Sequence, residues 1–188
     1  GGGVENHNSV LADENASLVS GPIDNGYWTD AGNFSTSWYD ATKSKFTILT
    51  AKELAGLAEL VNNGTNFAGK TIELDRDIDL SDHYWVPIGS SNAFKGSFNG
   101  QNHIVSSMYI KCDNFSYDSS RFDYVGFFGI VTTATIKNLT ISASSIDVKS
   151  PYGVNIGGIA GKNTEGSTIS DCKFSGNIVA NIAIGSYS

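Results

Sequence analysis

The sequence is poor in cysteine, proline, methionine and basic residues. Its two cysteines, Cys112 and Cys172, are not expected to form a disulfide, and without a nearby histidine pair they fall short of a zinc site. The 12 basic residues are outnumbered by 19 acidic ones, giving a net charge of -7. Nucleic acids and anionic membranes both require basic patches, so neither is an expected partner.

Long apolar runs and targeting signals are also missing. No run approaches the roughly 18 apolar residues of a membrane span, so no membrane insertion is expected. The chain carries no signal peptide, but Gly1 to Gly3 resemble a trimmed start, so this absence does not argue against secretion.

Catalytic motifs are absent as well. There is no His-Glu-x-x-His helix, nucleophile elbow or phosphate loop, and the histidines are three isolated residues. Asp123 and Asp147 fall at different phases of the repeat described below, so they do not form a catalytic carboxylate pair. We therefore predict no enzymatic activity, no catalytic residue, no metal site and no cofactor.

The chain contains instead a motif that recurs at a nearly fixed period. The segment Ile136 to Ile141 resembles Ile169 to Phe174, 33 residues later, and Val105 to Ile110, 31 residues earlier. The glycine motif Gly126 to Gly129 likewise returns as Gly158 to Gly161, offset by 32 residues. A fixed period with apolar residues at fixed phases is typical of solenoids.

The residues inside one repeat indicate a strand. The segments are short, rich in β-branched residues and flanked by glycine. Stacked repeats would bury three ladders of inward side chains, namely Val105, Ile136 and Ile169; Met108, Leu139 and Cys172; and Ile110, Ile141 and Phe174. The sequence therefore predicts an all-β fold, a right-handed parallel β-helix with strands about 4.8 Å apart.

Three regions precede or form this β-helix. We expect residues 1–26, which are polar and aperiodic, to be a leader or linker. Residues 27–69 are expected to form an aromatic flap plus a capping helix at about 51–62. Residues 70–188 are expected to form the β-helix repeats, followed by further repeats of the same chain.

The helix has clear start and stop signals. Thr50 to Glu53 reads as a capping box, apolar residues recur at helical spacing from Leu54 to Val61, and Gly64 follows. Such an amphipathic helix directly before the first coil is expected to cap the exposed end of the β-helix.

The flap is unusually aromatic. Its rings, from Tyr27, Trp28, Phe34, Trp38 and Tyr39, are expected to pack against the first coil or the helix. The alternative is a platform for stacking sugars, whose apolar faces suit aromatic rings.

Acidic residues alternate with apolar ones after Lys70. Arg76 breaks the apolar phase, so a corner is expected at Asp75 and Arg76. The acids Glu73, Asp75, Asp77 and Asp79 are expected to form a solvated strand face, with a calcium site as the alternative.

A polar ladder is also expected at one corner. Ser107, Asn138 and Asp171 share one phase, and we interpret them as a hydrogen-bonded stack rather than a ligand site.

Two segments interrupt the repeats. Residues 111–124 and 142–155 both follow the same strand and precede the same glycine motif, so they should emerge on one side, stacked on each other. We therefore place a candidate ligand-binding surface at Phe115, Tyr117, Tyr124 and Tyr152. Tyr117 and Tyr152 have polar neighbours and are expected to be the most exposed.

The ordered series of motifs resembles a known family. The pattern Gly, apolar, any residue, Gly, followed by Thr-Ile-x-[Asn/Asp], is similar to the GLUG repeat of bacterial surface and adhesin-like proteins. The same repeat occurs in non-catalytic regions of some IgA-cleaving metallopeptidases. Segments from Phe46 to Ala58, from Phe67 to Leu80 and from Trp85 to Ile104 resemble the region that precedes such repeats.

The resemblance implies an extracellular module associated with the cell surface. We expect a non-catalytic β-helical stalk or adhesive surface whose partner is a host or environmental glycan or a matrix protein. The alternative is a carbohydrate-active enzyme or a carbohydrate-binding module of the pectin-lyase-like kind.

Overall fold

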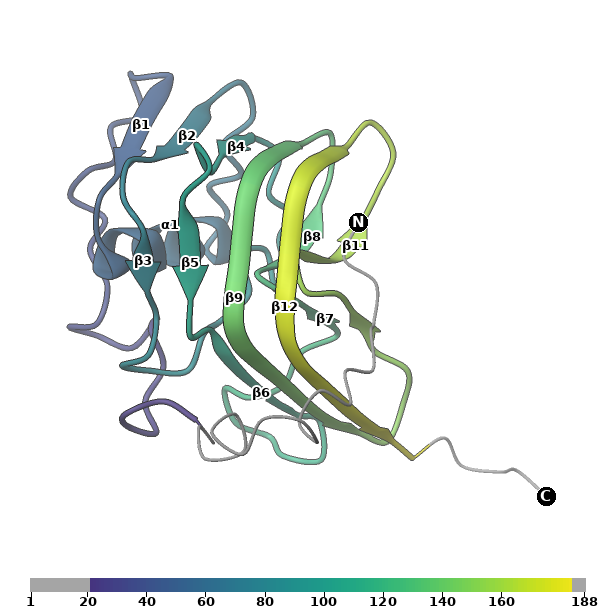
Figure 1. Cartoon of the computed structure of the whole chain (residues 1–188). Coiled ribbons are helices and arrows are strands. Elements are labelled where there is room, and N and C mark those ends of the chain that lie inside the picture. The colour runs from purple at the N-terminus through teal and green to yellow at the C-terminus, as the bar shows by residue number, and fades with distance from the viewer. Residues whose placement is uncertain (1–20, 184–188) are drawn as a thin grey trace.

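The computed structural model describes residues 21–183, which form β-strands and one helix (Figure 1). The elements are β1 (Lys45–Ile48), α1 (Ala51–Asn62), β2 (Thr71–Leu74), β3 (Ile78–Asp79), β4 (Ser97–Asn99), β5 (Ile104–Ser106), β6 (Tyr109–Asp113), β7 (Tyr124–Val125), β8 (Phe128–Val131), β9 (Thr135–Ser150), β10 (Asn155–Ile156), β11 (Ala160–Asn163) and β12 (Thr168–Ile182). The predicted all-β class is confirmed.

Every pairing between these strands is parallel, and β9 pairs with four of them, β4, β5, β6 and β12. The largest sheet follows the order β1-β2-β4-β9-β5-β3, and β6 and β12 also pair with β9. Two smaller sheets join β7 to β10 and β8 to β11. In Figure 1, β9 and β12 run side by side as two long curved strands, with β4, β5 and β6 along the other side of β9.

The long strands bend at residues with positive φ. In β9 these are Asn138 (φ 55) and Ala143 (φ 49), which we call the first and second bends. In β12, Asp171 (φ 52) lies at the first bend and Gly176 (φ 157) at the second. A Cβ on Gly176 would overlap the Ser144 carbonyl, so this position requires glycine.

The predicted inward ladders are confirmed between β9 and β12. Ile136 pairs with Ile169, Leu139 with Cys172, and Ile141 with Phe174. The predicted third members are wrong. Ile136 neighbours Phe98 rather than Val105, whereas Val105 pairs with Ile141. Ile110 pairs with Ile146, and Met108 lies near Ser144.

Unequal bend lengths cause this shift. Residues 99–104 separate Phe98 from Val105, but only residues 137–140 separate Ile136 from Ile141, so the earlier turn is two residues longer. In that turn Gln101 and Asn102 both have positive φ. The actual row of inward neighbours is Phe46, Ile72, Phe98, Ile136 and Ile169.

The interior between the sheets is strongly aromatic. Trp85 and Phe127 stack with ring centroids 5.4 Å apart and planes 7° apart. The buried Trp85 indole Nε1 donates to the Phe127 carbonyl at 3.1 Å, which satisfies its only polar atom. Phe128 meets Phe127 edge to face at 5.1 Å, so the glycine motif Gly126 to Gly129 supplies core rings as well as close backbone packing.

Helix α1 occupies the predicted residues. The Glu53 amide donates to Thr50 Oγ1 at 3.1 Å, as a capping box requires. The Glu53 carboxylate, however, accepts from the Leu49 amide at 2.9 Å rather than from that of Thr50. Leu54, Leu57 and Val61 are fully buried, and α1 lies behind β3 and β5 in Figure 1. Among the described residues, no helix has the length and apolar character needed to cross a membrane.

The end of α1 is fastened by one amide side chain. Asn62 donates to the Pro87 carbonyl at 3.1 Å and accepts from the amides of Gly89 and Ser90, both at 2.9 Å. Ile88 in turn bridges to Phe128 of β8. The helix therefore packs beside the chain segment that adjoins the β8 and β11 sheet.

Residues 21–26 are not part of a free leader, so this predicted boundary is wrong. Ile23 donates to the Ser81 carbonyl at 2.8 Å, and Tyr84 donates to the Gly26 carbonyl at 2.9 Å. Tyr27 and Tyr84 form a parallel bridge. The polar side chains gave no sign of this pairing because it depends on main-chain groups. Residues 1–20, including His7, lie outside the described residues.

The aromatic flap packs on the core. Trp28 is buried, and Trp38 stands against Phe46 and Phe67 with centroids 5.3 and 6.0 Å apart. The Trp38 indole donates to the carbonyls of Ser35 and Glu53 at 2.9 and 3.1 Å. The packing interpretation is confirmed for both tryptophans, since Trp38 is half-buried against the core and the burial of Trp28 leaves its ring no face for a sugar.

Candidate functional site

The two predicted insertions are shorter than expected. Residues 111–113 belong to β6, and residues 142–150 belong to β9, which leaves loops 114–123 and 151–154. The second segment was mistaken for an insertion because serine and proline mask its alternation, in which Ile146 and Val148 are fully buried. Because β6 pairs with β9 and β7 pairs with β10, the two loops leave and rejoin neighbouring strands.

Loop 114–123 is held at its base by Asn114, a residue that the sequence interpretation missed. Its buried amide donates to the Phe122 carbonyl at 2.7 Å and to Ser150 Oγ at 3.2 Å. Its oxygen accepts from the Phe122 amide at 2.8 Å. These bonds join the loop to the end of β9, beside loop 151–154.

Three side chains from the two loops meet above this base. Tyr117 is 92% exposed, and the guanidinium of Arg121 lies 4.7 Å from its ring centroid. A hydrogen bond with Tyr152 raises the pKa of Arg121, and negatively charged neighbours such as Asp123 act in the same direction. Tyr117, Arg121 and Tyr152, here called the loop triad, therefore combine aromatic faces with a permanent cation.

Arg121 was not predicted as a site residue. It is the only basic residue within loop 114–123, with Tyr117 four residues before it and Tyr124 three residues after it, and a lone cation among aromatic residues is the signal that identifies it. An exposed arginine over a tyrosine face is a cation–π pair worth about 0.5–1 kcal/mol.

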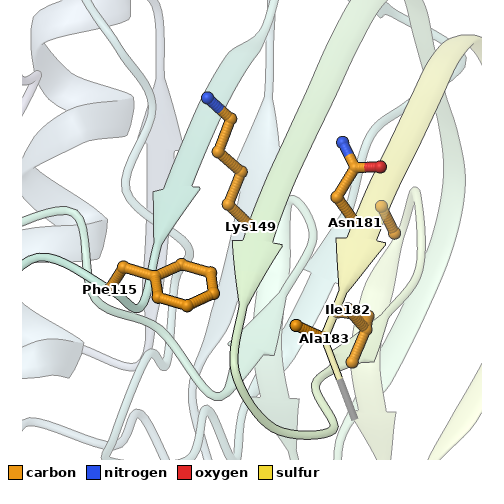
Figure 2. A pocket seen from close by; sticks show the side chains of 6 residues that line it. Phe115, Lys149, Asn181, Ile182 and Ala183 are labelled. Atoms are coloured by element: carbon orange, nitrogen blue, oxygen red, sulfur yellow. The ribbon is translucent and has the colours of Figure 1, made fainter. Parts of the chain in front are cut away.

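Phe115 borders a hollow at the ends of β9 and β12 (Figure 2). Its side chain is 55% exposed. The hollow measures about 470 Å³ and is lined by Phe115, Lys149 and residues 180–183. Figure 2 shows Lys149 and Asn181 extending from adjacent strands on the same side, in agreement with their register as direct neighbours.

Tyr124 differs from the other predicted site residues. It is half-buried, begins β7 instead of lying in a loop, and pairs with Asn155. The Lys162 Nζ lies 5.7 Å from its ring centroid. The structure therefore joins Tyr124 to β10 and β11, and it is not a member of the loop triad.

The acids after Lys70 have separate partners. Glu73 forms an ion pair with Lys45 at 3.2 Å, Asp77 accepts from the Ile104 amide at 2.9 Å, and Asp79 accepts from the Ser81 amide at 2.9 Å. The predicted corner at Asp75 and Arg76 is confirmed by the gap between β2 and β3. Within residues 21–183, no three or more histidine, cysteine or acidic side chains gather as a metal site.

The described histidines each pair with one aspartate. His83 lies 2.8 Å from Asp24 and His103 lies 3.1 Å from Asp77. The His83 hydrogen bond, followed by one from the Gly26 amide, lowers the pKa of Asp24. For Asp77 the Ile104 amide is the larger cause of a lowered pKa, and His103 adds to it. Both histidines thus fasten chain segments together.

The thiol of Cys112 is expected to be unreactive as a nucleophile. It is buried, and burial raises its pKa to about 11. A thiol with such a pKa is protonated at neutral pH and is a poor nucleophile. Cys112 and Cys172 are both free.

Comparison with known proteins identifies one motif. The family model described as the GLUG motif matches residues 152–179, a range that contains β10, β11, the repeated glycine pair Gly158 and Gly161, and most of β12. No curated protein and no solved structure matches the chain. The predicted resemblance is thus confirmed in this segment, and the chain contains a GLUG motif.

Proposed function

We propose that the chain is a non-catalytic recognition module of a bacterial cell-surface protein. Its parallel strands would be successive coils of a right-handed β-helix, and α1 would cover one end of the stack. The GLUG motif supports this assignment, because the resemblance links such repeats to surface and adhesin-like proteins. The module would act outside the cell, as an adhesive surface or as a stalk.

The loop triad is the observation that carries an adhesive role. Tyr117 presents nearly its whole side chain to solvent from a loop whose base is fixed by buried hydrogen bonds. Tyrosine and arginine are enriched among the residues that dominate binding energies, because they offer large contact areas and directional polar groups. An ordered base also limits the entropy lost when such side chains are held by a partner.

The partner would be a host or environmental glycan or a matrix protein. The hollow beside Phe115 favours the glycan, since its lining combines an aromatic ring with the side chains of Lys149 and Asn181 (Figure 2). This combination also supports a second candidate function, a carbohydrate-binding module of the pectin-lyase-like kind.

The test is retention of the whole chain on arrays of immobilised glycans and matrix proteins. Replacing both tyrosines (Tyr117→Ala with Tyr152→Ala) should abolish retention and lower the free energy of unfolding by no more than about 1 kcal/mol, the size of the lost cation–π pair. The matched control Asp75→Asn alters an exposed residue outside the loops and should retain parental binding.

Two results would contradict the adhesive role. Retention of the tyrosine double variant at parental levels would make the loops packing elements, and the module a stalk. Release of reducing or unsaturated sugars from a polysaccharide panel would instead favour an enzyme.

A further inference from the structure

A second polar surface lies at the first bend, near the start of β9, whereas the loop triad lies beyond its end. A hollow of about 440 Å³ is lined there by Asn102, Asn138, Thr140, Asp171 and Lys173. We call it the bend hollow. It corrects the predicted polar ladder, since Ser107 lies at the second bend and Asn102 takes its place.

The bend hollow spans three neighbouring stretches of chain. Asn102 lies between β4 and β5, and its main-chain N–H donates to the main-chain carbonyl of Asn138 at 2.9 Å. Thr140 of β9 pairs with Lys173 of β12 on one side and with Ile104 of β5 on the other. Two strand spacings give the hollow a length of roughly 10 Å along this direction.

The backbone does not explain the polar side chains at this bend. Asparagine and aspartate tolerate positive φ better than most residues, which is a sufficient reason for Asn138 and Asp171 taken alone. The second bend, however, places Ser107 (φ 56) and Ala143 (φ 49) in the same left-handed region without an amide or carboxylate side chain. A row of amide and carboxylate groups is therefore not a requirement of bending these strands.

The chemistry of the lining suits hydroxyl groups. The two amides and the Thr140 hydroxyl both donate and accept, Asp171 accepts and Lys173 donates, while the two charges cancel. Within residues 21–183 these five side chains form one hydrogen bond, a long one of 3.4 Å from Asn138 to Asn99. Ile104, which is 41% exposed beside Thr140, adds an apolar contact for carbon-bound hydrogens.

We propose that the bend hollow binds a neutral oligosaccharide laid across the three stretches of chain. The cancelling charges disfavour a strongly anionic polymer, and the single carboxylate is too few for a divalent cation. This site is independent of the loop triad, so either proposal can fail without the other.

The probes are three neutral pentasaccharides (cellopentaose, mannopentaose and N-acetylchitopentaose) and one acidic control, pentagalacturonate. Binding to the whole chain is followed by calorimetry and by amide chemical-shift mapping. At least one neutral probe should bind and shift amides at residues 102, 138–140 and 171–173, and the acidic probe should bind at least tenfold more weakly.

The matched variants use glycine to keep the bends intact. Combining Asn138→Gly with Asp171→Gly removes two polar groups while preserving access to positive φ, and should weaken binding at least tenfold. Ala143→Gly, a change to glycine at a positive-φ residue of the second bend, should leave affinity within twofold of the parent. The proposal is overturned if none of the neutral probes binds, or if the chemical shifts change only at other residues. It is also overturned if the acidic probe binds more tightly than the neutral ones, or if the glycine double variant binds as tightly as the parent.

Discussion

Strands β9 and β12 carry equivalent inward side chains but bury them differently. Ile136, Leu139 and Ile141 of β9 have no exposed area, whereas their direct neighbours in β12, Ile169, Cys172 and Phe174, are only half-buried. β9 has paired strands on both sides, while within the described residues β12 pairs with β9 alone. Burial in this fold is therefore set by neighbours along the stack as much as by the apolar pattern of one strand.

Strand β1 shows that the missing neighbour need not be a strand. It pairs only with β2 among the described strands, yet Phe46 and Ile48 are buried. Trp38 and Tyr39 pack against Phe46, and α1 adds its apolar face to the same core. One edge is thus covered by irregular chain and a helix, and the comparison with β12 can be tested by substitution.

The largest effect is expected from placing a polar side chain in β9. Ile136→Asn should lower the free energy of unfolding by about 3 kcal/mol, because it removes apolar burial and leaves an amide without partners. Ile169→Asn, the matched change in β12, should cost less than half as much, since its amide reaches water. Chemical denaturation measures both, and equal losses would refute the comparison.

The next largest loss of stability is expected from adding a methyl group to α1 where the helix contacts the flap. A Cβ on Gly56 would overlap the Ser35 carbonyl, so Gly56→Ala should cost about 2 kcal/mol despite the better helix propensity of alanine. Gly153→Ala places its Cβ in open space and serves as the control, within about 0.5 kcal/mol of the parent. Parental stability of Gly56→Ala would mean that the flap does not press on the helix.

Removing the helix cap should have a smaller effect. Thr50→Ala deletes the hydroxyl that accepts from the Glu53 amide and should cost about 1 kcal/mol. Thr50→Ser keeps the hydroxyl and should restore most of the loss. Thermal unfolding distinguishes the two variants, and identical midpoints would contradict a capping role for this oxygen.

The smallest effect concerns the contact of residues 21–26 with His83. The folded pKa of Asp24 lies below its ordinary value of 3.8, so its stabilising contribution is present above that value and is lost as pH falls through the folded pKa. Asp24→Asn should therefore weaken the fall in melting temperature between about pH 5 and pH 2. Superimposable pH profiles for parent and variant would show that this contact adds no stability.

The sequence predicts much of this structure because local patterns determine it. The helix follows from Thr50 and its apolar spacing. The register of β9 with β12 across the first bend follows from turns of equal length, whereas at the second bend β9 has one residue more than β12 and the register shifts. The register with β5 was missed because its turn is two residues longer, a difference that similarity of apolar residues conceals.

The candidate site was only partly predictable. The exposure of Tyr117 follows from its polar neighbours, whereas Tyr152 was predicted to be more exposed than Phe115 and is less so, at 38% against 55%. The contacts of Arg121 with both tyrosines depend on how two loops meet in space. The strand-like pairing of residues 21–26 uses main-chain groups, and its one side-chain contact, Asp24 with His83, joins residues too far apart in the sequence to be recognised as partners.

The row of neighbouring strands β1, β2, β4, β9 and β12 affects the order in which the chain can fold. Lys45 pairs with Thr71, Thr71 with Ser97, Ser97 with Thr135, and Thr135 with Thr168, so β1, β2, β4, β9 and β12 join the row in the order in which they are synthesised. The entropy of closing such loops varies by only roughly 0.3 kcal/mol between the shortest and the longest. Each completed strand offers an edge on which the next can form, so the chain can fold progressively from its N-terminal side while the ribosome is still synthesising the rest.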